Sequence, residues 1–272
     1  MSDKVILVVL DGLSYQVAHH CMGYLNGLIE ADRATLYKME CELPSMSRPL
    51  YECILTGIAP VNSGIVNNEI VRRSHFDSIF SLAQKAGKTT AAAAYYWVSE
   101  LYNRAPFVAT RDRFTNDKQL AIQHGCFYQA DHYPDDHLFI DAEYLRTQYS
   151  PDFLLIHPMN IDDAGHKFGL DSSQYRNSAR KADIILANYL PTWIAQNYQV
   201  IITSDHGMNN DHSHGGTLPE ERSVPLFVIG EQFSHHTECR VEQTALCGTI
   251  CALLGIDYAD KKICDELLAG DN

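Results

Sequence analysis

The sequence has few basic residues and no long apolar run, and each absence excludes a class of partner. Only 21 of the 272 residues are Lys or Arg, against 34 Asp or Glu, so the formal net charge is −13. Nucleic-acid polymers and anionic membranes bind basic protein surfaces, and we therefore expect neither as a partner. No segment approaches the roughly 20 apolar residues that a membrane-spanning helix requires.

Paired-cysteine motifs are also missing. The eight cysteines show no Cys-x-x-Cys spacing, and in a chain with a large core we expect reduced, mostly buried thiols. Cys247 and Cys251 lie one helical turn apart in an apolar segment, which favours core packing over a thiolate site. The apolar run at 5–10 is too short for a signal peptide and is followed directly by Asp11, so we expect a cytoplasmic protein.

Apolar strands alternate with helical segments along the chain. Strands are predicted at 5–10, 88–96, 153–157, 200–202 and 224–230, and helices at 14–30, 44–57, 76–86, 172–195 and 241–255. This alternation predicts an α/β fold, a central and mostly parallel sheet with helices on both faces. We expect a single domain over 1–272. It would carry a cap or small insertion at about 97–140, whose aromatic residues either cover the substrate mouth or pack into a peripheral subdomain.

The most informative stretch is 199–216, where a β-branched strand changes abruptly into a loop rich in potential metal ligands. Asp205 and His206 follow the strand, and His212 and His214 come shortly after, next to a Gly-Gly pair. Open α/β sheets bind ligands at the carboxyl ends of their strands, which is where these side chains would lie. Taken alone, the stretch is equally compatible with a turn and a solvated histidine loop.

Other potential ligands follow two further strands. Asp11 comes directly after the first strand, where its alternative role is that of a turn or helix-capping residue. Asp162 and His166 follow the strand at 153–157 with a spacing of four, which on a helix brings both side chains to one face within reach of a single cation. Without a metal, the pair would be an ordinary carboxylate and imidazole at a helix end.

Ser47 lies near the start of the predicted helix at 44–57, which Pro49 and Gly57 delimit. Its hydroxyl could cap the helix, or it could be a nucleophile, since the free N–H groups of a helix N-terminus favour an alkoxide and bind phosphoryl oxygens. The sequence alone leaves both readings open. Three strands that each lead into a carboxylate, with His166, His206, His214 and Ser47, nevertheless supply enough ligands for two neighbouring divalent cations.

These motifs resemble the alkaline phosphatase superfamily, and most closely its nucleotide pyrophosphatase/phosphodiesterase-like branch. The matching pieces occur in the family's order: Val-Leu-Asp-Gly at 9–12, Pro-Ser-Met-Ser-Arg-Pro at 44–49, Leu-Thr-Gly at 55–57, Asp-Asp-Ala-Gly-His at 162–166, Ser-Asp-His-Gly-Met at 204–208 and His-Gly-Gly at 214–216. The resemblance implies an alkaline-phosphatase-like metallohydrolase fold.

The resemblance also implies the division of the ligands. One metal would be held by Asp162, His166 and His214, with His212 as the rival of His214. The other would be held by Asp11, Asp205 and His206, with Ser47 bridging to the substrate. The mixture of imidazole and carboxylate favours zinc, with manganese as the alternative.

The implied activity is that of a two-metal phosphoric ester hydrolase, either a phosphodiesterase or a nucleotide pyrophosphatase. It would act on a small-molecule phosphate ester through a phosphoserine intermediate. The alternatives are a phosphomonoesterase, phosphomutase or phosphonate hydrolase of the same superfamily, or a catalytically silent metal-binding protein.

The chain departs from the family pattern at two places. Family phosphodiesterases commonly carry Thr as the nucleophile and Asn three residues later, where this chain has Ser47 and Leu50. Sulfatases place an Arg four residues after the nucleophile, where this chain has Tyr51, so a sulfatase is not expected. The role of Arg48 is left open, because its side chain could either bind phosphate or face solvent.

Overall fold

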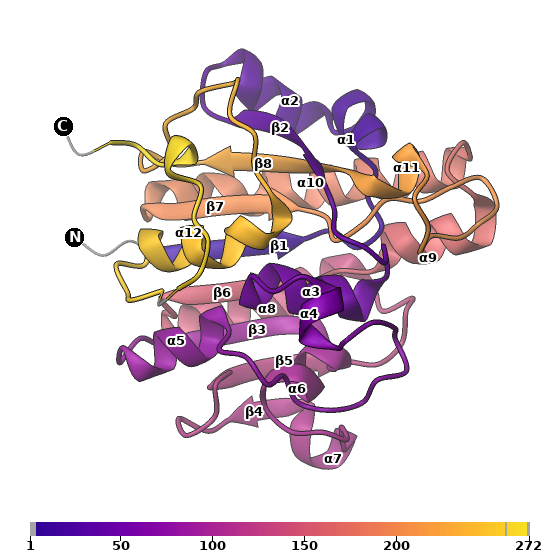
Figure 1. Cartoon of the computed structure of the whole chain (residues 1–272). Coiled ribbons are helices and arrows are strands. Elements are labelled where there is room, and N and C mark those ends of the chain that lie inside the picture. The colour runs from indigo at the N-terminus through magenta and orange to yellow at the C-terminus, as the bar shows by residue number, and fades with distance from the viewer. Residues whose placement is uncertain (1–3, 259, 271–272) are drawn as a thin grey trace.

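The computed structural model describes residues 4–258 and 260–270, and a single mixed sheet runs through the molecule (Figure 1). Within the described residues the sheet has eight strands in the order β2-β8-β7-β1-β6-β3-β5-β4. The strands are β1 Lys4–Val9, β2 Thr35–Glu40, β3 Thr90–Tyr95, β4 Phe114–Asn116, β5 His124–Tyr128, β6 Phe153–Ile156, β7 Tyr198–Thr203 and β8 Ser223–Ile229.

The centre of the sheet is parallel and its margins are antiparallel. Strand β1 pairs in parallel with β6 and β7, and β3 pairs in parallel with β5 and β6. By contrast, β8 runs antiparallel to β7 and β2, and β4 runs antiparallel to β5. The predicted α/β fold with a mostly parallel sheet is therefore confirmed.

Helices cover both faces of the sheet, so the molecule has three layers (Figure 1). Side chains of β1 alternate between the two resulting cores, with Val5 and Leu7 in one and Ile6 and Val8 in the other. The first core is closed by α3 Ser47–Thr56, α5 Ile79–Lys85, α6 Tyr96–Tyr102 and α12 Leu246–Leu253. The second is closed by α1 Tyr15–Cys21, α2 Gly23–Glu30, α8 Asp135–Tyr149 and α10 Ser173–Ala195.

The helices predicted at 76–86 and 241–255 are shorter in the structure, as α5 and α12, and two others differ at their ends in ways that bear on the site. The helix expected over 14–30 is broken at Met22 into α1 and α2, and the side chain of Ser14 caps α1, so Asp11 has no capping role. The helix expected over 44–57 begins only at Ser47 and ends at Gly57, whose positive φ of 74° closes it. Ser47 is thus the first residue of α3, and Met46 occupies the cap position.

Besides several short helices, the sequence patterns missed strands β2, β4 and β5 and helix α8. These four elements carry no continuous apolar run of the kind that marks the central strands. Strand β2 alternates buried and more exposed residues, as an edge strand does. Within 97–140 the structure places α7 Ala109–Asp112, β4 and β5, and the two strands extend the central sheet.

The remaining short elements connect the sheet to the site. They are α4 Pro60–Ser63, α9 Asn160–Phe168, α11 Pro219–Arg222, η1 Gln243–Ala245 and η2 Asp265–Leu267. Helix α9 follows β6 and packs against α10. In the part of the chain that is described, no helix combines the length and apolar content needed to cross a bilayer.

Candidate active site

Three neighbouring parallel strands deliver a carboxylate each to one edge of the sheet. Asp11 follows β1, Asp205 follows β7, and Asp162 lies in the first turn of α9, directly after β6. Because β7, β1 and β6 are adjacent and parallel, their carboxyl ends meet at the same edge. The three carboxylates are therefore brought together although they are up to 194 positions apart in the chain, and each is almost fully buried.

Gly12 makes this convergence possible. It has a φ of 72°, and a Cβ at this position would lie 2.8 Å from the Cα and Cβ atoms of Asp162. A residue with a side chain would push α9 away from the end of β1. The Gly12 N–H also donates to Asp205 Oδ1 at 3.2 Å. Gly12 itself follows β1, so this one residue contacts the segments that follow β6 and β7 as well.

The first ligand group consists of Asp11, Asp205 and His206, whose potential ligand atoms lie within 4.8 Å of one another. His206 Nε2 is 3.2 Å from Asp205 Oδ2 and 3.5 Å from Asp11 Oδ1. Ser47 Oγ lies 3.0 Å from the same His206 nitrogen. The first residue of α3 thus presents its hydroxyl to this group.

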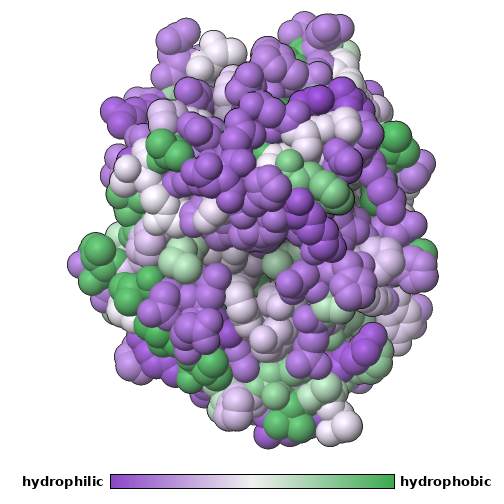
Figure 2. Space-filling model, turned by 90° about the vertical axis from the view of Figure 1, so that its right-hand side faces the viewer, coloured by the Kyte–Doolittle hydropathy of each residue, from purple (hydrophilic) through white to green (hydrophobic). Residues whose placement is uncertain are grey.

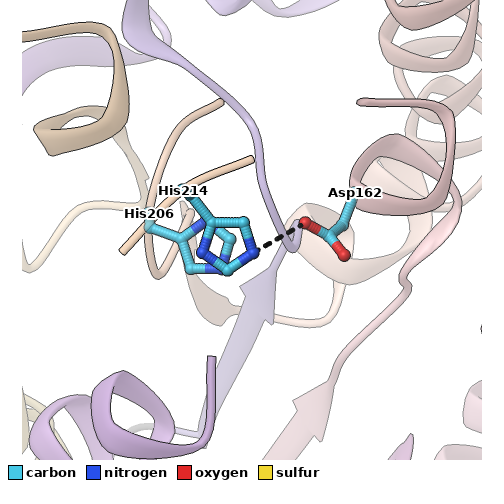
Figure 3. Close-up of side chains that lie close together, drawn as sticks. All are labelled: Asp162, His206 and His214. Atoms are coloured by element: carbon cyan, nitrogen blue, oxygen red, sulfur yellow. Dashed lines mark ion pairs between the residues drawn. The ribbon is translucent and has the colours of Figure 1, made fainter. Parts of the chain in front are cut away.

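The second group lies beside the first and shares His206 with it. Asp162, His206 and His214 bring their ligand atoms within 4.8 Å, and the rings of His206 and His214 stack with centroids 3.6 Å apart (Figure 3). His166 completes the cluster, since its Nε2 lies 3.3 Å from Asp162 Oδ2 and 3.2 Å from His214 Nε2. The structure thus brings together every residue that the sequence proposed for the site: Asp11, Ser47, Asp162, His166, Asp205, His206 and His214.

The three site histidines share one orientation. Each places Nδ1 against a backbone carbonyl oxygen: His166 against His212 at 2.9 Å, His206 against Gly207 at 2.8 Å and His214 against Ser45 at 2.7 Å. A carbonyl can only accept, so in the neutral rings Nδ1 carries the proton and Nε2 carries a lone pair. In that state all three Nε2 lone pairs face carboxylate oxygens, an arrangement that repels unless a proton or a metal cation lies between them.

The carboxylates are also incompletely hydrogen-bonded. Among the described residues, Asp11 Oδ1, Asp162 Oδ1 and Asp205 Oδ2 are buried without a partner. Unpaired buried acceptors are costly and therefore rare in folded proteins. Burial and the neighbouring charge of Asp11 raise the pKa of Asp162 and, to a greater extent, that of Asp205. Hard oxygen and borderline nitrogen donors in this arrangement fit divalent cations such as zinc or manganese.

The two outer imidazoles differ in their surroundings. The hydrogen bond with Asp162 raises the pKa of His166 to about 9, whereas burial and the nearby His206 lower the pKa of His214 to about 3. The side chain of His166 is 45% exposed and that of His214 only 5%. The second group therefore opens to solvent on the His166 side, while the first group is enclosed.

His212 and Arg48 have other contacts. His212 supplies its backbone carbonyl to the ring of His166 and is exposed, so the geometry favours His214 over His212 as the ligand. Arg48 is buried: it pairs with Glu100 at 2.8 Å, and its guanidinium lies 4.6 Å from the centre of the Trp97 ring. Neither of the roles left open for Arg48, phosphate binding or facing solvent, matches this position.

Three residues at the site were missed by sequence reasoning. Tyr51 and His157 both hydrogen-bond to Asp11 Oδ2. Asn68, from the loop after α4, accepts the Arg48 N–H through Oδ1 at 3.0 Å and so lies at the first turn of α3. The local signal for Tyr51 was its helical spacing of four from Ser47, whereas Asn68 lies 21 positions away in the loop after α4, where no periodic pattern relates it to Ser47.

The surface around the opening is mainly hydrophilic. Figure 2 shows the side of the molecule on which α9 and α11 lie in Figure 1, and its hydrophobic residues form small separate groups. Phe168, two positions after His166, and Leu218, four positions after His214, are 47% and 44% exposed. The site thus faces a polar surface with isolated apolar side chains.

Curated relatives match almost the whole chain. GPI ethanolamine phosphate transferase 2 from Candida albicans is 32% identical over 280 residues, which cover 93% of this chain and 30% of that protein. The catalytic subunit of the human GPI ethanolamine phosphate transferase 2 is 23% identical over 277 residues, 93% of this chain and 26% of that protein. The chain spans about a third or less of the length of these relatives.

Solved structures share the fold at low sequence identity. Murine ectonucleotide pyrophosphatase / phosphodiesterase 5 superposes with a TM-score of 0.79 at 14% identity, covering 98% of this chain and 100% of that one. The C-terminal periplasmic domain of EcEptC from Escherichia coli, in a complex with Zn, gives a TM-score of 0.68 at 13% identity, covering 96% of this chain and 85% of that one. These likenesses confirm the alkaline-phosphatase-like fold.

The family follows from the sequence match. The model of the type I phosphodiesterase / nucleotide pyrophosphatase family matches residues 5–215, which include all seven candidate site residues. The resemblance seen in the motifs is thereby confirmed. The chain belongs to the type I phosphodiesterase / nucleotide pyrophosphatase family, an enzyme family of the alkaline phosphatase superfamily.

Proposed function

We propose that this chain is a divalent-metal-dependent enzyme that cleaves phosphodiesters through a covalent intermediate on Ser47. One observation carries the proposal: next to the Ser47 hydroxyl, three imidazole Nε2 atoms and three unpartnered carboxylate oxygens face one another. Two neighbouring cations held by these groups would neutralise phosphoryl oxygens and lower the pKa of the hydroxyl. Zinc is the preferred metal and manganese the alternative.

Ser47 is well placed to be the nucleophile. Its hydroxyl lies on the first residue of α3, 3.0 Å from His206 Nε2, and its side chain caps no helix. In the first step Ser47 Oγ would form a bond to phosphorus while the bond from phosphorus to the leaving alcohol breaks. The leaving alcohol takes up a proton, and one half of the diester stays on Ser47.

Fewer N–H groups are free at this helix start than the sequence suggests. The Arg48 N–H is donated to Asn68 Oδ1, and Pro49 has none. Within the described residues this leaves the Ser47 N–H and the Asn68 amide group as unpaired donors at the first turn. Two such donors would bind the phosphoryl oxygens and stabilise the charge that develops on them.

The second step defines the reaction class. If water attacks the phosphoseryl ester, the enzyme is a phosphodiesterase, as the motifs predict. If another alcohol attacks, it is a transferase, and the relatives named GPI ethanolamine phosphate transferase 2 favour this second candidate. The net charge predicts that the chain has no membrane partner. The names of these relatives do not support that prediction.

The decisive experiment uses the zinc- or manganese-reconstituted chain with bis(p-nitrophenyl) phosphate and, separately, p-nitrophenyl phosphate. Preferential turnover of the diester supports the proposal, and preference for the monoester supports the phosphomonoesterase alternative. Repeating the diester reaction with added ethanolamine or glycerol separates the two second steps. A new mixed diester among the products identifies a transferase, whereas the monoester alone identifies a hydrolase.

The nucleophile is tested by Ser47→Ala with Ser63→Ala as the matched control. Ser63 is equally buried, and its hydroxyl contacts only the backbone near α4, at Pro60 and Ile65. Ser47→Ala should lose turnover by at least about a thousandfold while binding metal normally, and intact-mass analysis should find no trapped phosphoryl adduct. Near-normal turnover in Ser47→Ala would remove the basis of the proposal.

A further inference from the structure

The two oxygens of Asp11 have opposite surroundings. Oδ2 accepts hydrogen bonds from Tyr51 Oη and from His157 Nε2, the latter at 3.0 Å. Oδ1 has no hydrogen-bond partner among the described residues and faces His206 Nε2 at 3.5 Å. One oxygen is therefore fully engaged on the side away from the ligand groups, and the other points into them.

The backbone fixes the tautomer of His157. Its Nδ1 accepts the N–H of Tyr95 at 3.4 Å, so the ring proton must lie on Nε2, where it is donated to Asp11. The backbone of His157 is held on both sides, because its N–H donates to Ala93 and its carbonyl accepts from Tyr128 at 2.7 Å. His157 is 1% exposed, so this donor has little freedom to turn away.

Tyr51 provides the second donor from the helix that carries Ser47. The two residues lie four positions apart on α3 and therefore on one face of it. The Tyr51 ring packs edge-on against the His157 ring, with centroids 4.5 Å apart, and is 2% exposed. The hydroxyl of Tyr51 thus connects the start of α3 to the carboxylate at the end of β1.

We propose that Tyr51 and His157 are positioning residues that hold Asp11 so that it offers a metal only its Oδ1. With Oδ2 occupied by two donors, Asp11 binds through one oxygen, which leaves coordination positions open for Ser47 and the substrate. This inference rests on the proposed function. Donors that orient a ligand in this way typically change metal affinity by about 10- to 100-fold when they are removed.

Tyr51 has a second consequence for the site. Because it lies one turn from Ser47 on the same helix, the bond to Asp11 also fixes the distance between the nucleophile and the metal-binding oxygen. Loss of the Tyr51 hydroxyl should therefore disturb both metal binding and the alignment of Ser47. Loss of the His157 donor should disturb mainly metal binding.

The test measures the affinity for Zn²⁺ by competition with a chromophoric chelator in the intact chain, without substrate. We expect Tyr51→Phe and His157→Leu each to weaken Zn²⁺ binding about tenfold or more. His157→Gln should restore most of the affinity, because Gln Nε2 reaches the same position as His Nε2 and can donate to Oδ2. A purely structural role for His157 would not distinguish Leu from Gln in this way.

Tyr102→Phe is the matched control. Tyr102 is also buried, and its hydroxyl also donates to a buried carboxylate, that of Glu52 on α3, with Oε2 at 2.9 Å. It should reduce thermal stability about as much as Tyr51→Phe and leave the Zn²⁺ affinity unchanged. Unchanged affinity in Tyr51→Phe and His157→Leu, with wild-type protein that binds Zn²⁺, would overturn the inference alone. Wild-type protein that binds neither Zn²⁺ nor Mn²⁺ would instead overturn the proposed function.

Discussion

His166 Nε2 and His214 Nε2 lie 3.2 Å apart, although each ring places its Nδ1 against a backbone carbonyl. Two facing lone pairs would repel, so the contact requires a positive charge, which either a proton on His166, whose pKa is raised to about 9, or a bound metal ion would supply. Asp162 lies 3.3 Å from one and 3.7 Å from the other. Together with the carboxylate of Asp162, this pair of imidazoles forms a centre suited to bind a cation.

We expect bound metal to raise the stability of the folded chain. Zn²⁺ at about 100 times its dissociation constant should raise the Tm of chelator-stripped protein by about 5 °C or more, because only the folded chain assembles the site. Differential scanning fluorimetry with and without Zn²⁺ measures the shift. Asp162→Asn should reduce it, and Asp163→Asn, in the same helical turn and paired with Lys167, should not. No shift in the wild type would contradict metal binding.

Asn68 should contribute to turnover rather than to folding. Asn68→Ala removes an amide donor at the start of α3, and we expect kcat/KM for a phosphodiester to fall about 100-fold. Asn67→Ala is the control, since Asn67 lies in the same loop and accepts only the Glu69 N–H, at 2.9 Å. Steady-state kinetics of both variants decide the question, and equal effects would argue for a general disturbance of the loop.

Arg48 should matter mainly for stability. Arg48→Met leaves the carboxylate of Glu100 buried without its partner, and we expect a loss of about 3 kcal/mol in the free energy of unfolding. The double variant Arg48→Met/Glu100→Gln should recover part of that loss, because no charge then remains buried. Urea denaturation measures both. If Arg48→Met were as stable as the wild type but had a much higher KM, phosphate binding would be the better explanation.

Asp135 predicts a pH dependence of stability. Burial raises its pKa to about 7, so between pH 4 and 7 the folded chain holds a proton that the unfolded chain releases. The resulting stabilisation is complete below the unfolded pKa and is lost as the pH rises through about 7, with an upper limit of about 4 kcal/mol.

Asp135→Asn removes that pH dependence. Its Tm relative to the wild type should therefore increase from pH 5 to pH 8. The exposed neighbour variant Asp136→Asn is the control for net charge and should show no such trend. A constant Tm difference between Asp135→Asn and the wild type across this range would show that the carboxyl of Asp135 does not titrate there.

Two of the cysteines should respond to an oxidant. All eight thiols are free, and Cys239 Sγ lies 3.3 Å from Cys264 Sγ. Oxidised glutathione should convert this pair into a disulfide, with release of two reduced glutathiones, and raise the Tm by about 5 °C, because the bond closes a loop in the unfolded chain. Non-reducing peptide mapping identifies the bond. Cys239→Ser should abolish the shift, and a shift that persists would point to other thiols.

The amino-acid sequence by itself determined the fold class, the family and the seven candidate ligand and nucleophile residues that meet at the site. Continuous apolar runs mark strands buried on both faces, and parallel strands end at a common edge, so Asp11, Asp162 and Asp205 could be grouped without coordinates. The spacing of Asp162 and His166 placed them correctly on one helix face. The edge strand β2 was missed because its alternation leaves no continuous apolar run.

Only the tertiary structure decided what each atom of the site contacts. The adjacency of β7, β1 and β6 makes His206 common to both ligand groups, a sharing that linear spacing cannot reveal. The donors to Asp11 Oδ2 come from residues 40 and 146 positions away, and Arg48 is held by Glu100, 52 positions away. Such contacts depend on how helices and loops pack across the sheet, and that packing follows from the whole chain rather than from any local pattern.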